Sequence, residues 1–132
     1  MYTVSVETTF FAIHGLQLRD GTMEPRHGHE WRACAHFARA DLDEDGMVID
    51  FAEARAALDS ATEELRQTDL NVHPGLRGRN PTAENLARHI FERLRDLGQP
   101  SVTRVQITEA LGCVATYEPP LCDPGIQNAP II

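Results

Sequence analysis

The chain has 132 residues, 42% of them hydrophobic, a length that supports one globular core and leaves little room for a second domain. Its formal net charge of −8 at pH 7 argues against a nucleic-acid or anionic-membrane surface, because either needs clustered basic side chains. With no apolar run of membrane-spanning length and no secretory signal, we expect a soluble cytoplasmic protein with a small-molecule ligand.

Two long segments near the N-terminus alternate between apolar and polar residues, the pattern of half-buried strands. The first covers residues 3–13 and is followed by His14 on the apolar face. The second covers residues 26–40, and its apolar face begins with His27 and His29. A polar loop joins the two segments, so we predict an antiparallel hairpin.

Two helices are predicted to follow. Asp50 is a suitable N-cap for a helix that starts at Phe51. A second helix is predicted to begin at Asn80-Pro81, with Asn80 as its cap, and to end before Gly98. The apolar stripes are Phe51, Ala54, Leu58, Ala61 and Leu65 in the first helix, and Ala83, Leu86, Ala87, Ile90, Leu94 and Leu97 in the second.

Two short strands, 102–108 and 113–118, are predicted to form a closing hairpin, and the Pro-rich tail 119–132 shows no periodic pattern. The order ββααββ predicts one α+β domain over residues 1–118, an antiparallel sheet with both helices on one face. The cysteines, Cys34, Cys113 and Cys122, are odd in number without Cys-x-x-Cys spacing, which favours free thiols.

The acidic turn after the second strand resembles part of a calcium loop. Asp41, Asp43, Asp45 and Gly46 occupy the first, third, fifth and sixth positions of an EF-hand. The twelfth position, which requires a bidentate glutamate, is Ala52. We therefore interpret the segment as a solvated turn and not as a calcium site.

Three histidines form the strongest candidate site. His27 and His29, at i and i+2 on one strand, project from the same face and can bind one ion. His14 ends the neighbouring strand of the predicted hairpin. Three imidazoles with an open fourth position are typical of catalytic zinc, although a His-x-His pair can also be two ordinary strand histidines.

An ordered set of motifs resembles the 6-pyruvoyl tetrahydropterin synthase and 6-carboxytetrahydropterin synthase family. The resemblance implies the tunnelling fold (T-fold), in which subunits form trimeric barrels that often stack as hexamers, with pterin sites at subunit interfaces. It also implies zinc bound by His14, His27 and His29, and a pterin ring anchored at Thr108-Glu109. The motifs are Phe11-Ala12-Ile13-His14-Gly15-Leu16, His27-Gly28-His29, Gly46-Met47-Val48-Ile49-Asp50-Phe51, Leu70-Asn71, Asn80-Pro81-Thr82-Ala83-Glu84-Asn85-Leu86 and Thr108-Glu109.

Glu109 has a chemical argument of its own. A carboxylate accepts two hydrogen bonds side by side, and the adjacent ring N–H and amino group of a pterin present two donors at matching spacing. The alternative is an exposed acid at the end of a strand.

The chain departs from the family at its catalytic positions. Met23 stands where the family has its cysteine, and a thioether cannot take a proton. The neighbouring Glu24 resembles a glutamate that replaces the cysteine in a variant subfamily, where cleavage yields 6-hydroxymethyl-dihydropterin. The alternative interpretation of Glu24 is a solvated loop acid. Arg66 and Gln67 stand in place of an Asp-His pair, and neither relays protons near neutral pH.

These departures leave three hypotheses open. The first is a divergent homologue that binds a pterin-like ligand without the ordinary synthase reaction. The second is an active zinc-dependent lyase on dihydroneopterin triphosphate, with Glu24 as the base. The third is a protein whose three histidines hold no metal, because ligand spacing shows capacity and not occupancy.

Overall fold

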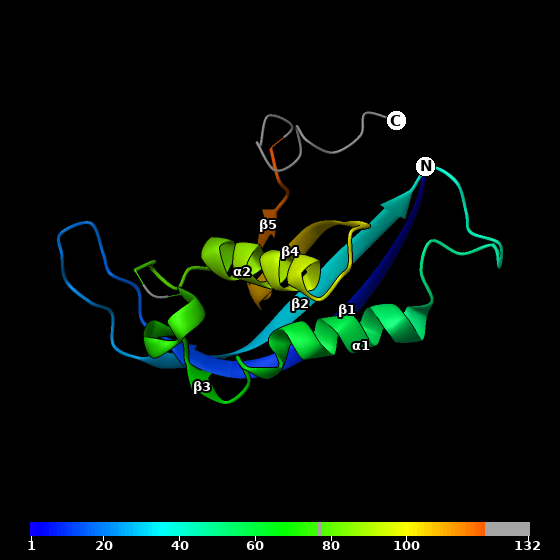
Figure 1. The fold of residues 1–132 in the computed structure, drawn as a ribbon. Helices are drawn as coiled ribbons and strands as arrows, with labels where there is room; N and C mark the ends of the chain where they lie inside the picture. Colours follow the sequence, from blue (N-terminus) through cyan, green and yellow to red (C-terminus); the bar gives the residue numbers. More distant parts are fainter. Residues whose placement is uncertain (77, 121–132) are drawn as a thin grey trace.

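Within residues 1–76 and 78–120, the part of the chain that the computed structural model describes, a five-stranded sheet forms one layer and two α-helices form the other (Figure 1). The strand order is β3-β1-β2-β4-β5. The elements are β1 (Tyr2–His14), β2 (His27–Arg39), α1 (Phe51–Glu63), β3 (Thr68–Asp69), α2 (Ala83–Asp96), β4 (Val102–Ala110) and β5 (Cys113–Tyr117), with 3-10 turns at Leu70–Val72 and Pro74–Leu76.

The two predicted hairpins are confirmed. β1 and β2 pair antiparallel along their whole length, from Tyr2 opposite Arg39 to His14 opposite His27. β4 adds to β2, and β5 adds to β4, both antiparallel. The predicted antiparallel sheet is therefore confirmed for these four strands, and β3 is an unpredicted fifth strand that joins the edge of β1 in parallel. Two residues are too few to show a strand period in the sequence.

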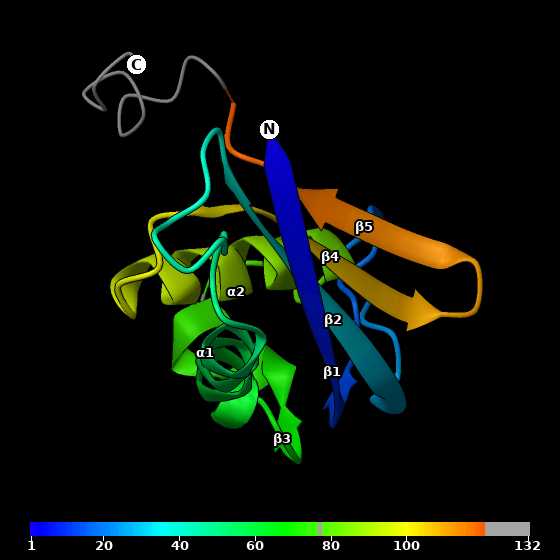
Figure 2. The same ribbon diagram turned by 90° about the vertical axis from the view of Figure 1, so that its right-hand side faces the viewer.

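Both helices cover the same face of the sheet (Figure 2). That face is formed by alternate, fully buried side chains such as Phe10 and Trp31, as the strand periodicity predicts. Leu58 of α1 and Ile90 of α2 are buried against it. No helix in the described residues combines the length and the apolar character that crossing a bilayer requires.

Two members of the predicted helix stripes are not in the core. Phe51 is 66% exposed, because at the first position of α1 its side chain borders a surface pocket beside Tyr2. Leu97 follows the end of α2 and is 39% exposed. Leu65 is buried as expected, although α1 ends before it at Glu63.

The predicted start of the second helix is also wrong. The N-cap is Thr82, whose side chain accepts a hydrogen bond from the amide of Asn85, and the helix begins at Ala83. Asn80 does not cap the helix, because both polar atoms of its side chain bond to the main chain of Gln17. Asp50 caps α1 as predicted.

Most of β1 lies at an open edge of the sheet. β3 pairs only with Ala12 and Ile13, so among the described residues the segment 2–11 has no strand on its outer side. On the other side of the sheet, β5 is the last strand. The described sheet therefore ends in two unpaired edges. The candidate free thiol Cys122 lies outside the described residues, whereas Cys34 and Cys113 are free.

Candidate metal centre

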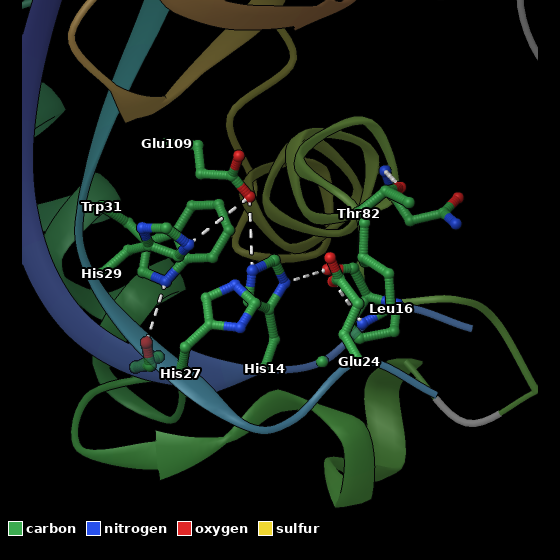
Figure 3. A network of polar contacts seen from close by, with 12 residues as sticks. His14, Leu16, Glu24, His27, His29, Trp31, Thr82 and Glu109 are labelled. Atoms are coloured by element: carbon green, nitrogen blue, oxygen red, sulfur yellow. Dashed lines mark hydrogen bonds and ion pairs between the residues drawn. The ribbon is translucent and has the colours of Figure 1, made fainter. Parts of the chain in front are cut away.

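The hairpin of β1 and β2 brings the three predicted histidines together. His14 and His27 form the last residue pair of the hairpin, and His29 stands opposite Ala12 on the same face. One ring nitrogen from each of the three lies within 4.8 Å of the others. Figure 3 shows the imidazoles pointing toward one another, with Glu109 approaching from β4.

Main-chain carbonyls orient two of the rings. Nδ1 of His14 lies 2.8 Å from the carbonyl oxygen of Pro81, and Nδ1 of His27 lies 2.9 Å from that of Pro25. Because a carbonyl oxygen only accepts, each Nδ1 carries the hydrogen and donates it. In the neutral ring the Nε2 atom then carries the lone pair, which faces the centre of the cluster. Metal-binding histidines usually adopt this tautomer when the other ring N–H donates to a carbonyl.

The interior of the cluster has the features of a cation site. Nε2 of His14 and of His29 are buried without a hydrogen-bond partner. Oε1 of Glu109 lies 3.3 Å from the first and 3.8 Å from the second. A lone pair and a carboxylate oxygen repel at such a distance unless positive charge lies between or on them. Three imidazole nitrogens are a donor set that suits zinc, so the residues present fit the metal that the family implies.

Burial favours the metal-binding form of His29. Partial burial lowers the pKa of His29 below its ordinary value of 6.5, while the negative charge of Glu109 acts in the opposite direction. A histidine must be neutral to bind a metal, so the lowered pKa keeps the ring competent at neutral pH.

Trp31 forms the floor beneath two of the histidines. Its ring packs edge-on against His14 and His29, with centroids 4.9 Å and 5.1 Å away. The indole is fully buried, and its N–H donates to the carbonyl oxygen of Ala12 at 3.1 Å. A rigid aromatic side chain therefore limits the rotation of both imidazoles.

Glu109 also borders a surface pocket of about 330 Å³ between the start of α2 and β5. Its carboxylate is thus placed between the histidine cluster and a space that can admit a small molecule. Thr108 is paired with Arg32 on β2 and with Val114 on β5, and the register of β4 with β5 shifts between Thr108 and Ala110, at Glu109. A direct side-chain role for Thr108 in ligand binding stays a prediction.

Glu24 lies beside the cluster in the loop between β1 and β2 (Figure 3). Its Oε1 accepts a hydrogen bond from the amide of Leu16 at 2.9 Å, and its own amide donates to the carbonyl of Leu16 at 2.8 Å. The carboxylate is close enough for its charge to raise the pKa of His29 as a minor effect. Met23, at the family's cysteine position, is half exposed.

The segment that replaces the Asp-His pair is engaged elsewhere in this chain. Arg66 donates to the carbonyl of Thr9 at 2.7 Å. Gln67 adopts a left-handed conformation with φ 57° and donates its amide to the carbonyl of Phe11. These contacts tie the segment to β1 and supply no titrating side chain.

Asp69 and His73, the nearby acid and histidine, are not brought together as a substitute pair. Asp69 pairs with Arg26 at 3.2 Å. The ring of His73 instead packs against that of His89, with centroids 5.6 Å apart. This agrees with the expectation that their spacing is wrong for a dyad.

Sequence reasoning missed the supports of the site. The carbonyl of Pro81, the indole of Trp31 and the side chains of Asn71 and Asn80 all contact the site or its loop. In the sequence, Asn71 belongs to a short motif and Asn80 is a candidate helix cap, and nothing in their spacing shows that their side chains bind the loop after β1.

A model of the family described as 6-pyruvoyl tetrahydropterin synthase matches residues 3–120. The chain belongs to this family. It is 33% identical over 129 residues to the 6-carboxy-5,6,7,8-tetrahydropterin synthase of Synechocystis, an alignment that covers 94% of this chain and 98% of that protein. Membership of the 6-pyruvoyl tetrahydropterin synthase family supports a function related to pterin synthesis.

Solved structures of the family share the fold. The Caenorhabditis elegans 6-pyruvoyl tetrahydropterin synthase superposes with a TM-score of 0.79 at 19% identity, covering 90% of this chain and 96% of that one. A Plasmodium vivax 6-pyruvoyl tetrahydropterin synthase variant, described as having cysteine in place of a catalytic glutamate, superposes with a TM-score of 0.69 at 15% identity, covering 89% and 97%. The expected T-fold is therefore confirmed.

Proposed function

We propose that this chain binds a pterin-like small molecule at a zinc ion held by His14, His27 and His29. The observation that carries the proposal is the buried Nε2 of His14, which faces a carboxylate oxygen of Glu109 without a hydrogen bond. A cation between these groups removes their repulsion. When bound, zinc supplies a Lewis acid that polarises a substrate oxygen.

Glu109 is the proposed anchor of the pterin ring. Its side chain is 31% exposed, so it can accept hydrogen bonds from a ligand in the pocket that it borders. The second oxygen of a carboxylate remains available when the first faces a metal site. Thr108, the preceding residue, is included in the proposed ligand site, where its contribution is tested by the change Thr108→Val.

A second candidate function is a zinc-dependent lyase acting on a dihydropterin such as dihydroneopterin triphosphate. The specific observation in its favour is the position of Glu24, whose carboxylate is held beside the histidine cluster by the amide of Leu16. In the Plasmodium vivax relative a glutamate is described as a catalytic residue. In the proposed reaction Glu24 accepts a proton from the substrate side chain, a role that Met23 cannot perform.

Homo-oligomeric assembly, as a trimer or a stacked hexamer, is part of the proposal. The open edges of β1 and β5 support it, because an unpaired edge offers backbone groups to a neighbouring strand. Light scattering coupled to size exclusion measures the mass directly. A monomer at micromolar concentration would contradict this part.

The test of pterin binding is calorimetric titration of the zinc-loaded protein with 7,8-dihydroneopterin. We expect saturable binding that falls by about tenfold or more in Glu109→Gln, because one charge-assisted hydrogen bond contributes about 1.5–3 kcal/mol. Glu84→Gln is the matched control, since Glu84 borders the same pocket from α2. Absence of binding to the wild-type protein, or an equal loss in both variants, would overturn the proposal.

A further inference from the structure

The first residues of the loop between β1 and β2 are bound on one side by two asparagine side chains. Asn71 accepts a hydrogen bond from the amide of Gly15 at 2.8 Å and donates to the carbonyl of the same residue at 2.7 Å. Asn80 likewise accepts a hydrogen bond from the amide of Gln17 at 2.8 Å and donates to the carbonyl of Gln17 at 3.0 Å. The side-chain amide of each asparagine therefore makes the same two hydrogen bonds that a residue of a neighbouring β-strand would make.

The other side of this segment is bound by Glu24. Leu16, between the two clamped residues, donates its amide to the Glu24 carboxylate and accepts from the Glu24 amide. Since successive main-chain groups of an extended segment point to opposite sides, Gly15–Gln17 lies between the asparagines and Glu24. The position of Glu24 thus depends on where the two asparagines hold the segment.

We infer that Asn71 and Asn80 are positioning residues, which act through residues 15–17 to keep the carboxylate of Glu24 beside the histidine cluster. The inference rests on the proposed function to the extent that Glu24 serves the reaction. The same clamp adjoins His14, which is bonded directly to Gly15 in the chain. One device therefore holds both a proposed metal ligand and the proposed base.

The chemistry of the clamp requires asparagine at both positions. A side-chain amide offers one donor and one acceptor in a plane, whereas an aspartate offers acceptors only and would face a carbonyl oxygen. The asparagines are themselves fixed, because Asp69 accepts from the Asn71 amide at 3.0 Å and Asn85 donates to the carbonyl of Asn80 at 2.8 Å.

Gly15 is required for the close approach of the two sides. A Cβ atom built on Gly15 would lie 2.5 Å from the carbonyl oxygen of Glu24, which is main chain and cannot rotate away. Any larger residue at this position would push Glu24 away from the segment. The absence of a side chain at Gly15 and the two asparagines therefore both keep Glu24 close to residues 15–17.

Hydrogen exchange of individual amides tests the clamp without reference to activity. The Leu16 amide reports its own bond to Glu24, so we expect its exchange to become about tenfold faster in Asn80→Ala and in Asn71→Asp, as the loss of roughly 1.4 kcal/mol implies. The two variants keep the result interpretable if one fails to fold. Asp20→Asn is the control, because the hydrogen bonds that Asp20 accepts among the described residues come from Thr22 in the loop tip. Unchanged exchange at Leu16, or an equal change in the control, would overturn the inference.

Steady-state kinetics separates positioning from a merely structural role. With dihydroneopterin triphosphate as substrate, we expect Asn80→Ala to lower kcat about tenfold with KM nearly unchanged, because Glu109 and the metal still hold the ligand. Faster exchange with an unchanged kcat would refute the positioning role. If the wild-type protein shows no turnover, the lyase proposal fails, and the exchange of the Leu16 amide still decides whether the clamp holds Glu24.

Discussion

The Nε2 atom of His14 lies 3.3 Å from Oε1 of Glu109, and the two atoms share no hydrogen bond. Because Nδ1 of His14 donates to Pro81, a neutral His14 ring has no hydrogen to offer Glu109. The pair therefore accommodates positive charge, and the proposed metal ion would satisfy both partners at once.

The first prediction concerns metal stoichiometry and affinity. Protein purified without chelator should contain about one zinc per chain by elemental analysis. His29→Ala should weaken zinc binding by more than about 100-fold, the upper end of what loss of an outer contact causes. His36→Ala is the control, since His36 lies on the same strand but contacts Gln106 on the opposite face. A wild-type ratio near zero would end the metal proposal.

Trp31 provides an optical test of where the metal binds. It is the single tryptophan of the chain and packs against His14 and His29. Copper(II) or cobalt(II), which quench indole emission at short range, should therefore quench its fluorescence in a saturable manner. Equal quenching in the wild-type protein and in His27→Ala would show that the metal binds somewhere else.

Glu24→Gln tests the proposed proton acceptor. The change preserves size and removes basicity, so we expect turnover of dihydroneopterin triphosphate to fall about 10²–10⁴-fold while the affinity for dihydropterin is retained. Glu30→Gln, on the exposed side of β2, is the control. If Glu24→Gln retains full activity, a different group takes the proton.

His89 should make stability depend on pH. Burial lowers its pKa below the ordinary 6.5, against the opposing effect of the hydrogen bond that its Nε2 donates to Glu64, and His73 and Arg93 are the other charged or titratable neighbours. As pH falls below about 6.5, the unfolded chain takes up a proton that the folded protein resists, so stability present above this pH is lost. Urea unfolding at about pH 8 and about pH 5.5 should show a smaller loss for His89→Gln than for the wild-type protein. A loss at least as large in the variant would contradict the assignment.

Two glycines of the site motifs should differ in their tolerance of alanine. The new Cβ at Gly15 meets the main chain of Glu24, whereas at Gly28 it meets the ring of Phe11, which is partly exposed and can turn. Gly15→Ala should therefore destabilise by about 1–3 kcal/mol and Gly28→Ala by less. Thermal unfolding of the two variants measures the difference, and the reverse order would show that the loop yields more easily than the ring.

The sequence predicted those helices and strands that are long enough to show a regular spacing of apolar residues. Alternation over β1 and β2 assigned His27 and His29 to one face, and the hairpin then had to bring His14 to them. β3 is too short to have a period. Asn80 and Thr82 are both good caps, and the choice between them depends on Gln17, which is distant in sequence.

The loop of the site was beyond prediction for a similar reason. The bond between Glu24 and Leu16 depends on a turn whose shape is set by Asn71 and Asn80, and these approach from other parts of the chain. Sequence patterns within a short segment cannot predict contacts with residues that are distant in the chain. The functions of Glu24, Thr108 and Glu109 accordingly stay predictions from chemistry and resemblance.

The open edge of β1, where segment 2–11 has no neighbouring strand among the described residues, also has a consequence for the solubility of the protein. If the chain assembles as proposed, a subunit separated from its neighbours would present unpaired main-chain amides and carbonyls of this edge to other strands, which is a route to precipitation. We therefore expect mutants that block subunit contact to be lost as insoluble material and not recovered as well-behaved single chains. Resistance to aggregation would then belong to the closed ring and not to the individual polypeptide.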